Sequence, residues 1–215
     1  MATHKPAGQI RDFVQHRGRQ KVSPYDALRD WGGAPDALEV SGMKIARERA
    51  ALRRRELSRP LRQAMADSLV GPATNVLDFG CGHGDDVKHL LARGVPATGW
   101  DPALRPDTEL RSSHVVNLGY VLNVIEAARE RTDTLQRAWA LAEEVLVVSV
   151  RTVHERRDLL GESMADGLVT KRRTFQKFFE PAEAMALIAS AVGTPAVAVT
   201  PGIFYVFRNE ATREA

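Results

Sequence analysis

Three glycines at alternate positions and two aspartates form the part of this sequence best suited to hold a ligand. A short apolar run ends in Asp78, and Gly80, Gly82 and Gly84 follow it directly before a helix-like segment. Glycine lets the backbone take unusual dihedral angles and lie against a ligand, and the free N–H groups at a helix start favour a polar or anionic group. Asp101 ends a second apolar run, 17 residues beyond Gly84, close to the ~20-residue offset at which an acid reaches ribose hydroxyls in dinucleotide folds.

The glycine spacing separates two classes of cofactor. A dinucleotide fingerprint reads Gly-x-Gly-x-x-Gly, whereas these glycines alternate strictly after an acid. This pattern resembles motif I of class I S-adenosylmethionine (SAM) dependent methyltransferases, in which the first acid and the glycine loop hold the methionine end of SAM and the second acid holds the ribose. The alternative is a glycine turn that serves only the backbone. The cofactor-binding residues that the resemblance implies are Asp78, Phe79, Gly80, Cys81, Gly82, Gly84, Asp101, Asn117 and Leu118.

Length and cysteine content limit the class of protein. At 215 residues the chain suits one domain with a sizeable core. We expect no signal peptide, because the start is polar, and no membrane span, because no apolar run approaches ~20 residues. Cys81 is the only cysteine, which excludes an intrachain disulfide and a multi-cysteine zinc site and favours a reducing cytoplasm. A metal site at Cys81, His83 and Asp85 is disfavoured because these positions belong to the glycine loop.

Positive charge is concentrated in the N-terminal third. The net charge is +3, but residues 1–73 carry 14 Lys/Arg against 8 Asp/Glu and the remainder carries 16 against 19. Residues 43–63 are the most basic stretch, and a basic face of this kind can be an electrostatic footprint for DNA or RNA. A solvated helix face explains the same charges equally well.

The chain divides into three expected parts. Residues 1–42 form an arm without sustained periodicity. Residues 43–73 form a basic helical extension, with one helix from Met43 to Leu57 and a second after Ser58. Residues 74–210 form the SAM-binding domain.

Alternating strand and helix patterns in that domain predict an α/β, Rossmann-like class I methyltransferase fold with a mostly parallel sheet. Only 13 residues separate Asp101 from Val115, too few for two helices and a strand, so we expect strand three to be missing or vestigial. Helices are expected at Gly119–Glu130 and Thr132–Ala142. The fold should close with a terminal antiparallel hairpin around Pro201.

Two of the candidate catalytic residues lie at the end of the strand expected at His114–Leu118. Amino-methyltransferases of DNA carry Asp/Asn/Ser-Pro-Pro-aromatic at this place, where oxygens orient the amine and the ring stacks on a flipped base. Asn117 and Tyr120 keep the outer positions of that motif, but leucine and glycine replace the prolines. Small-molecule methyltransferases often have an aromatic-Val-Leu-polar-x-Ile run here, which Tyr120–Ile125 resembles equally well. We expect Asn117 and Tyr120 to orient the acceptor, His154 to act as a base, and residues 151–177 to form a lid.

Several phrases together resemble the DNA phosphorothioation-associated methyltransferase family. That family is named for gene neighbourhood, so the resemblance implies SAM use more directly than a DNA substrate. The phrases are Leu57–Pro60, Asp78–Asp86, Gly99–Pro102, Asn117–Glu126, Thr174–Phe178 and Gly202–Phe207.

Three functions are consistent with these features. The first is methyl transfer to a nucleic-acid base or another amine or hydroxyl, favoured by the basic residues 43–63. The second is methyl transfer to a small-molecule acceptor, favoured by the compact size and the lid. The third is a non-catalytic SAM-binding subunit.

Overall fold

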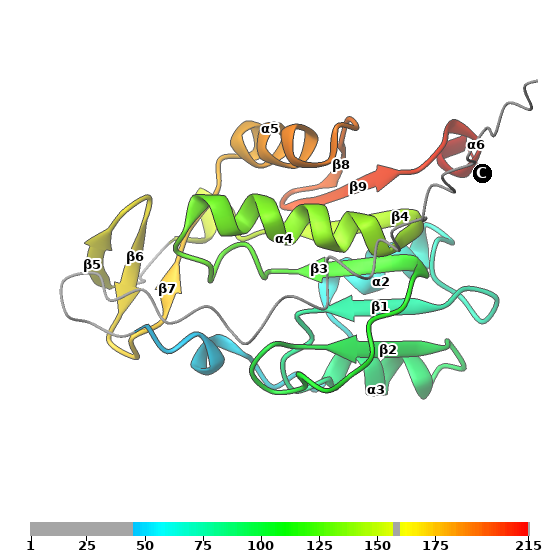
Figure 1. Ribbon diagram of the computed structural model, residues 1–215, viewed down its shortest axis with the longest axis horizontal. Coiled ribbons are helices and arrows are strands. Elements are labelled where there is room, and N and C mark those ends of the chain that lie inside the picture. The colour runs from blue at the N-terminus through cyan, green and yellow to red at the C-terminus, as the bar shows by residue number, and fades with distance from the viewer. Residues whose placement is uncertain (1–44, 157–159, 215) are drawn as a thin grey trace, which may run out of the picture.

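A computed structural model describes residues 45–156 and 160–214, so the expected arm, residues 1–42, lies outside the described residues. Its centre is a six-stranded sheet in which the first four strands are parallel and the last two form an antiparallel hairpin (Figure 1). The mostly parallel α/β fold and the terminal hairpin are therefore confirmed. In spatial order the strands are β2 (Ala97–Trp100), β1 (Val76–Phe79), β3 (Ser113–Gly119), β4 (Ala142–Ser149), β9 (Ile203–Phe207) and β8 (Val197–Thr200).

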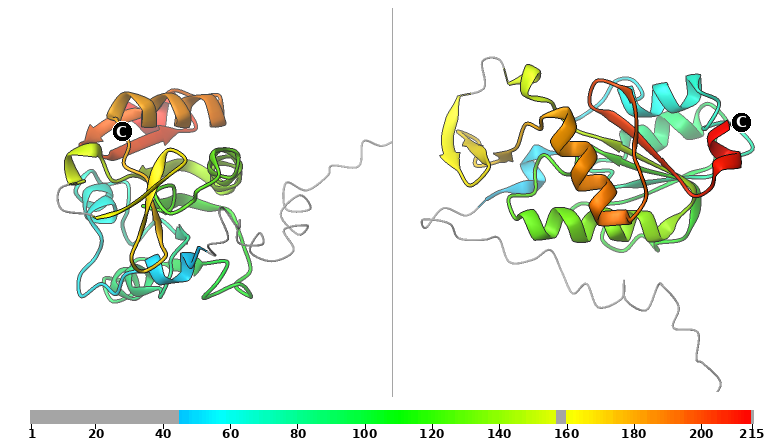
Figure 2. Two further views of the ribbon diagram at one scale, coloured as in Figure 1. Left: turned by 90° about the vertical axis from the view of Figure 1, so that its left-hand side faces the viewer. Right: turned by 90° about the horizontal axis from the view of Figure 1, so that it is seen from above.

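Helices cover both faces of the sheet, as near-continuous apolar strands require. One face packs against α4 (Ala128–Leu141) and α5 (Pro181–Val192) through a buried cluster that includes Leu118. The other face packs against α2 (Arg59–Ala66) and α3 (Asp85–Leu91) through a cluster that includes Leu61 and Leu90. The right-hand view of Figure 2 shows α4 and α5 on one side of the sheet and α2 on the other. A short helix, α6 (Glu210–Glu214), ends the described chain.

Strand β2 is an edge strand, because no strand forms between Trp100 and Ser113. This interval contains turns and one isolated bridge between Asp101 and Arg105. The expectation that strand three is missing is therefore confirmed, and the cause is the short connection.

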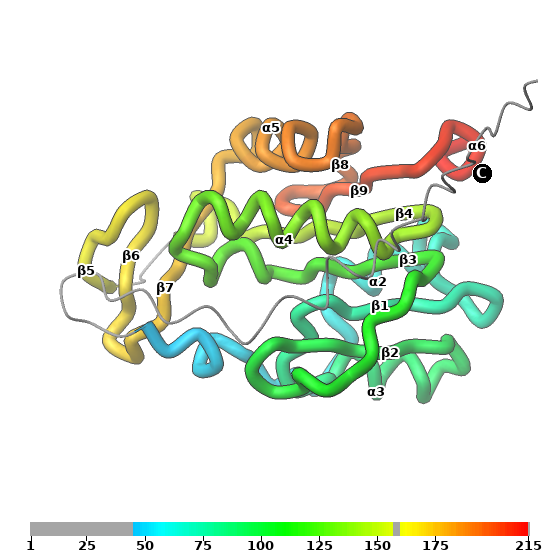
Figure 3. The backbone as a smooth tube through the Cα atoms, in the orientation of Figure 1, coloured from blue at the N-terminus to red at the C-terminus, as the bar shows by residue number. Residues whose placement is uncertain are grey.

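The predicted helix from Met43 to Leu57 is wrong over its described part, which has only the 3₁₀ turn η1 (Arg47–Ala50). Hydrogen bonds to other parts of the chain replace the helical ones: the backbone N–H of Ala46 donates to the carbonyl of Arg173, and that of Arg54 donates to Asp85. The segment is thereby stretched across the domain instead of coiled. Figure 3 shows it running from the neighbourhood of β7 toward α3.

The predicted helix Gly119–Glu130 is also wrong, because residues 120–127 form a turn and α4 begins only at Ala128. Tyr120 has a left-handed φ of 62°, which ends any regular structure at the strand terminus. The side-chain amide of Asn123 donates to the carbonyl of Lys177, and the backbone carbonyl of Asn123 accepts from the N–H of Lys177. These bonds connect the turn to a distant segment and take the place of helical bonds. The helix expected at Thr132–Ala142 is confirmed as the greater part of α4.

The expected lid contains a small antiparallel sheet that the sequence pattern did not predict. After the turn η2 (Val153–Glu155), the strands are β5 (Gly161–Met164), β6 (Gly167–Thr170) and β7 (Phe175–Gln176). Val169 and Phe175 bury their side chains against Ile45 of the stretched N-terminal segment. None of the described helices combines the length and hydropathy needed to cross a bilayer.

Candidate functional site

A cavity of about 1220 Å³ lies at the carboxyl ends of β1, β2 and β3. Its other walls are the stretched segment, residues 45–59, and the turn between β6 and β7. This volume exceeds the ~300–1,000 Å³ of typical ligand pockets, so it has room for a cofactor and a second ligand. Of the predicted site residues, it is lined by Asp78, Phe79, Gly80, Cys81, Gly82, Asp101, Asn117 and Tyr120.

The glycine loop between β1 and α3 is shaped by backbone angles that favour glycine. Gly80, Gly82 and Gly84 have φ values of 85°, 54° and 73°. A Cβ on Gly80 would overlap the side chain of Val121. The N–H groups of Gly80 and Cys81 both donate to the carbonyl of Trp100, at 2.8 and 3.0 Å. The loop is therefore closely fixed against β2, and its surface is backbone rather than side chain.

Asp101 organises the next part of the wall. Its Oδ2 accepts a hydrogen bond from the N–H of Gly82 at 3.0 Å. Its Oδ1 accepts from the N–H groups of Ala103 and Leu104 at 3.0 and 2.9 Å. Three backbone donors thus hold the half-buried carboxylate at the end of β2, in the position expected of an acid that binds a ribose.

Asp78 and Asn117 form the floor of the cavity. The two residues are register partners on the parallel strands β1 and β3, and the Nδ2 of Asn117 donates to Oδ1 of Asp78 at 2.8 Å. Burial raises the pKa of Asp78 to about 7, and the nearby charge of Asp86 adds to the shift. The Oδ1 of Asn117 is buried without a hydrogen-bond partner among the described residues. A buried acid and an unpartnered amide oxygen together favour a ligand that brings a cation and a hydrogen-bond donor.

Tyr120 directly follows β3 and lines the same cavity. Its left-handed φ of 62° is uncommon for a residue with a Cβ, and its N–H donates to the carbonyl of Ser149 at 2.9 Å. The guanidinium of Arg54 lies 5.6 Å from the centre of the ring. Burial raises the pKa of the phenol, so Tyr120 is a neutral hydrogen-bonding group at physiological pH.

Three predicted site residues do not line the cavity. Gly84 is the N-cap of α3, and Leu118 is buried in the core. His154 is exposed on η2, and the cavity wall includes its neighbour Glu155 instead.

Two arginines of the wall were missed as site residues. Arg54 was assigned to a basic helix, although a tertiary contact holds it. Arg151 is the second residue after β4, and a charged residue near the carboxyl end of a central parallel strand is a signal that could have identified it.

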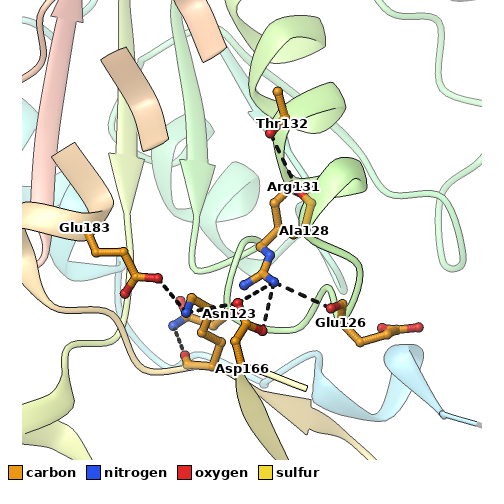
Figure 4. Close-up of polar contacts among 8 residues, drawn as sticks. Asn123, Glu126, Ala128, Arg131, Thr132, Asp166 and Glu183 are labelled. Carbon is orange, nitrogen blue, oxygen red and sulfur yellow. Dashed lines mark hydrogen bonds and ion pairs between the residues drawn. The ribbon is translucent and has the colours of Figure 1, made fainter. Parts of the chain in front are cut away.

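The turn between β6 and β7 belongs to the cavity wall, and we call the small sheet β5 to β7 that carries it the roof. Ion pairs of two buried side chains attach the roof to the rest of the domain (Figure 4). The Arg131 side chain on α4 is 2% exposed and forms an ion pair with Asp166, in the β5–β6 turn, at 2.7 Å. The Lys177 side chain is 6% exposed and pairs with the same carboxylate at 3.1 Å and with Glu183 on α5 at 2.7 Å. These contacts join the roof to two helices of the domain.

Asn123 connects the same region through hydrogen bonds between uncharged groups. Its Nδ2 donates to the carbonyl of Lys177 at 2.5 Å, and its Oδ1 accepts from the N–H of Arg151 at 3.0 Å. The side chain is almost completely buried, with 1% of the residue exposed. The turn after β3 is thereby tied both to the end of β4 and to the roof.

No group of three or more metal-ligating side chains is present within residues 45–156 and 160–214. The pKa of the Cys81 thiol is raised to about 12, chiefly by burial. Cys81 is therefore a protonated thiol, which is a poor metal ligand.

Comparison with solved structures identifies the fold. No family profile matches the sequence, and no curated protein is significantly similar to it. The SAM-bound structure of CalS10, an amino pentose methyltransferase from Micromonospora echinaspora involved in calicheamicin biosynthesis, is similar with a TM-score of 0.51 and 15% identity, over 70% of this chain and 90% of that one. DesVI from Streptomyces venezuelae is similar with a TM-score of 0.50 and 13% identity, over 68% and 90%. The chain therefore has the Rossmann-like fold of class I SAM-dependent methyltransferases, whereas the resemblance to the phosphorothioation-associated family stays a prediction.

Proposed function

We propose that the protein is a SAM-dependent methyltransferase, with SAM at the Asp78 end of the cavity and the methyl acceptor at the Tyr120 end. The observation that carries this proposal is the pair of Asp78 and Asn117 below the glycine loop. The acid is held near its point of ionisation and the amide oxygen is unpartnered. A ligand with an ammonium group and a nearby positive sulfonium would satisfy both.

Each cofactor residue has a role that follows from its contacts. The glycine loop offers a surface without side chains, Asp101 offers its carboxylate to ribose hydroxyls, and Asp78 balances the positive charge. When bound, SAM supplies a methyl group that is already activated by the sulfonium. The protein then has to align the acceptor with that methyl group and remove a proton where the chemistry needs it.

The acceptor residues we propose are Asn117 and Tyr120, because they lie on the same cavity floor at the end of β3. His154 is left out because its exposed side chain lies outside the cavity wall. An amine or hydroxyl acceptor can donate its N–H or O–H to the unpartnered Oδ1 of Asn117 or to the hydroxyl oxygen of Tyr120, and it then keeps a lone pair to face the methyl group.

Two classes of acceptor have support from different observations. A nucleic-acid base is supported by the arginines of residues 45–63 that line the cavity, and DNA in particular by the sequence resemblance to the phosphorothioation-associated family. A small molecule is supported by the roof of β5 to β7, which covers the acceptor end.

The test is SAM binding by calorimetry, followed by transfer of a labelled methyl group to DNA, RNA and a small-metabolite extract offered in parallel. Asp101→Ala is expected to weaken SAM binding about a hundredfold, since hydrogen bonds to charged groups contribute about 1.5–3 kcal/mol. Asp107→Ala, which removes an exposed acid from the same connection, is the matched control. SAM binding that is equally tight in wild type and Asp101→Ala would contradict the proposed cofactor site. SAM binding without label in any fraction would support a non-catalytic SAM-binding subunit instead.

A further inference from the structure

The cavity wall carries unpaired positive charge. Four lining arginines are paired with carboxylates: Arg47, Arg53, Arg54 and Arg62. Six other lining cations have no carboxylate within ion-pair distance among the described residues: Arg49, Arg55, Arg59, Arg151, Lys171 and Arg172.

The carboxylates that line the cavity form no ion pairs with these six cations, and most of them have other hydrogen-bond or ion-pair partners. Asp101 is held by backbone N–H groups at the glycine loop. Asp86 pairs with Arg54 and accepts from the N–H of Ser58. Burial and the charge of Glu155 raise the pKa of Tyr120, and Oε1 of Glu155 accepts from the N–H of Thr152.

Tyr120 shares the cavity wall with three arginines: Arg54, Arg59 and Arg151. Burial raises the pKa of the Tyr120 phenol, whereas the positive charges of these arginines each lower it. They come from the stretched segment, from the first turn of α2 and from the end of β4.

These three arginines are not equally free to bind a ligand. Arg54 is committed to Asp86, at 3.7 Å, and to the face of Tyr120. Arg59 gives one donor to the hydroxyl of Thr200 at 2.9 Å. Arg151 is half-buried, and the structure gives its guanidinium no hydrogen-bond or ion-pair partner among the described residues.

Arg151 is nevertheless fixed at its backbone. Its N–H donates to Oδ1 of Asn123 at 3.0 Å, and its carbonyl accepts from Nδ2 at 3.3 Å. A guanidinium has five donors in a planar fork that matches the oxygens of a phosphate. A half-buried fork on a fixed backbone, with no partner, is an arrangement that an anionic ligand would complete.

We propose that the acceptor end is a phosphate-binding site, in which Arg151 and Arg59 hold a phosphate of the methyl acceptor beside Tyr120. This proposal rests on the proposed function for the identity of the ligand as acceptor, but not for the binding of phosphate itself. The two ends of the cavity then have opposite charge. The acid at the cofactor end binds a cationic cofactor, and the arginines at the other end orient an anionic acceptor toward it.

The phosphate can come from a nucleic-acid backbone or from a phosphorylated metabolite. Lys171 and Arg172 are exposed in the β6–β7 turn and lie at the edge of the cavity. A nucleic-acid strand would carry further phosphates past these two residues, whereas a small phosphorylated acceptor would end before them.

The first experiment measures binding of inorganic pyrophosphate to the full chain by calorimetry. Arg151→Gln is expected to weaken binding tenfold or more, about the effect of one charge-assisted hydrogen-bonded pair, and Arg59→Gln about threefold. Arg151→Lys should recover part of the loss because it keeps the charge but not the fork. The matched control is Arg129→Gln, which removes the same charge from an exposed position on α4 that does not line the cavity.

Equal pyrophosphate affinity in wild type and Arg151→Gln would overturn the proposal, and so would an equal loss in Arg129→Gln, which would indicate attraction to net charge alone. SAM binding is measured on the same samples and shows that each variant is folded. If the wild-type protein bound pyrophosphate but did not bind SAM, the proposed function would be refuted and the phosphate site would still be supported.

The second experiment identifies the source of the phosphate by competition with pyrophosphate. A 20-nucleotide single strand that displaces it, with affinity lowered by Lys171→Gln/Arg172→Gln and by salt, indicates nucleic acid. Displacement by mononucleotides or sugar phosphates, unaffected by that double variant, indicates a metabolite. Either outcome supports the site, and displacement by neither would contradict its assignment to the acceptor.

Discussion

The two ends of the cavity are built in different ways. The cofactor end comes mainly from residues 76–104, with Asn117 added from β3, and is held by backbone angles and by hydrogen bonds to backbone N–H groups. The acceptor end is assembled from four separate parts of the chain, residues 45–59, 117–125, 151–155 and 160–176. It is held largely by charged side chains. The first end therefore depends on local backbone geometry and the second on long-range ion pairs.

The two ends should therefore tolerate different amino-acid substitutions. A backbone-shaped wall can vary its side chains but has little freedom at the glycines. An ion-paired wall can vary its backbone but has little freedom at the charges, since a buried cation without a partner is strongly unfavourable.

The largest expected effect comes from breaking the backbone geometry with Gly80→Ala. The new Cβ would meet both a left-handed φ and the side chain of Val121, so we expect a loss of about 3 kcal/mol in the free energy of unfolding, from strain and overlap together. Chemical denaturation measures this loss, and SAM binding should fall with it.

Gly94→Ala is the matched control, because Gly94 has a similar φ of 75° but no atom within 4 Å of the added Cβ. It should lose only the cost of the angle, about 1 kcal/mol. If the two variants lost equal stability, the contact with Val121 would have no part in shaping the loop.

The next effect comes from removing the carboxylate that the two buried cations share. Asp166→Asn leaves Arg131 without a carboxylate and Lys177 with Glu183 alone. Because Asp166 is partly exposed, we expect about 2 kcal/mol of destabilisation, less than for a fully buried pair. Thermal unfolding at low and high salt measures it. Exposed Asp107→Asn is the control, and a change as small as that of the control would mean that the ion pairs do not hold the roof.

The pH dependence of the same carboxyl follows from its lowered pKa, which hydrogen bonds and charges from Arg131 and Lys177 produce against the opposing effect of burial. A carboxyl whose pKa is lower in the folded state stabilises the protein above the unfolded value and loses this contribution as the pH falls through the folded value. The wild type should therefore lose part of its advantage over Asp166→Asn below about pH 4.

A smaller effect is expected from the pH dependence of SAM binding at Asp78, whose pKa is raised where that of Asp166 is lowered. With the pKa of Asp78 at about 7, SAM affinity should fall about tenfold between pH 8 and pH 6 as the carboxylate is protonated. Calorimetry over this range measures it, and a flat profile would contradict the charge-balancing role. Asp78→Asn should bind SAM weakly at both pH values.

The stability of the same variant gives an independent check. A group whose folded pKa is raised stabilises most at low pH, and this contribution is lost as the pH rises through the folded value. Asp78→Asn should therefore gain stability relative to wild type between pH 5 and pH 8. An opposite trend in denaturant unfolding would show that Asp78 is ionised in the folded protein.

The smallest expected effect is at His154. Its exposed side chain lies outside the cavity wall, so His154→Ala should change the methyl transfer rate less than about twofold, as surface substitutions usually do. A loss of a hundredfold, at unchanged stability, would show that η2 brings His154 into the cavity during the reaction.

The sequence locates the glycine-loop part of the cavity wall because its determinants are local, whereas SAM binding there stays a prediction. The alternating glycines and Asp78 lie within seven residues, and the short interval after Asp101 was sufficient to predict the missing strand. The acceptor end was predicted only at Asn117 and Tyr120, which border a strand. The arginine stretch near residue 54 has helix-forming composition, and only the tertiary bonds to Asp85, Asp86 and Arg173 prevent a helix. Such bonds have no signature in a single sequence, and neither do the roof strands, whose core is completed by Ile45 from a distant segment.

Asn123 also determines how the roof can move. The N–H of Arg151 donates to its side chain, and the N–H of Lys177 donates to its backbone carbonyl. One buried residue thus protects amides on two segments that are far apart in the sequence. Both protons become accessible to water only when the turn, the end of β4 and the roof separate together. Hydrogen exchange at these two sites would then follow a single opening event, with the roof behaving as part of one cooperative unit and not as a fraying loop.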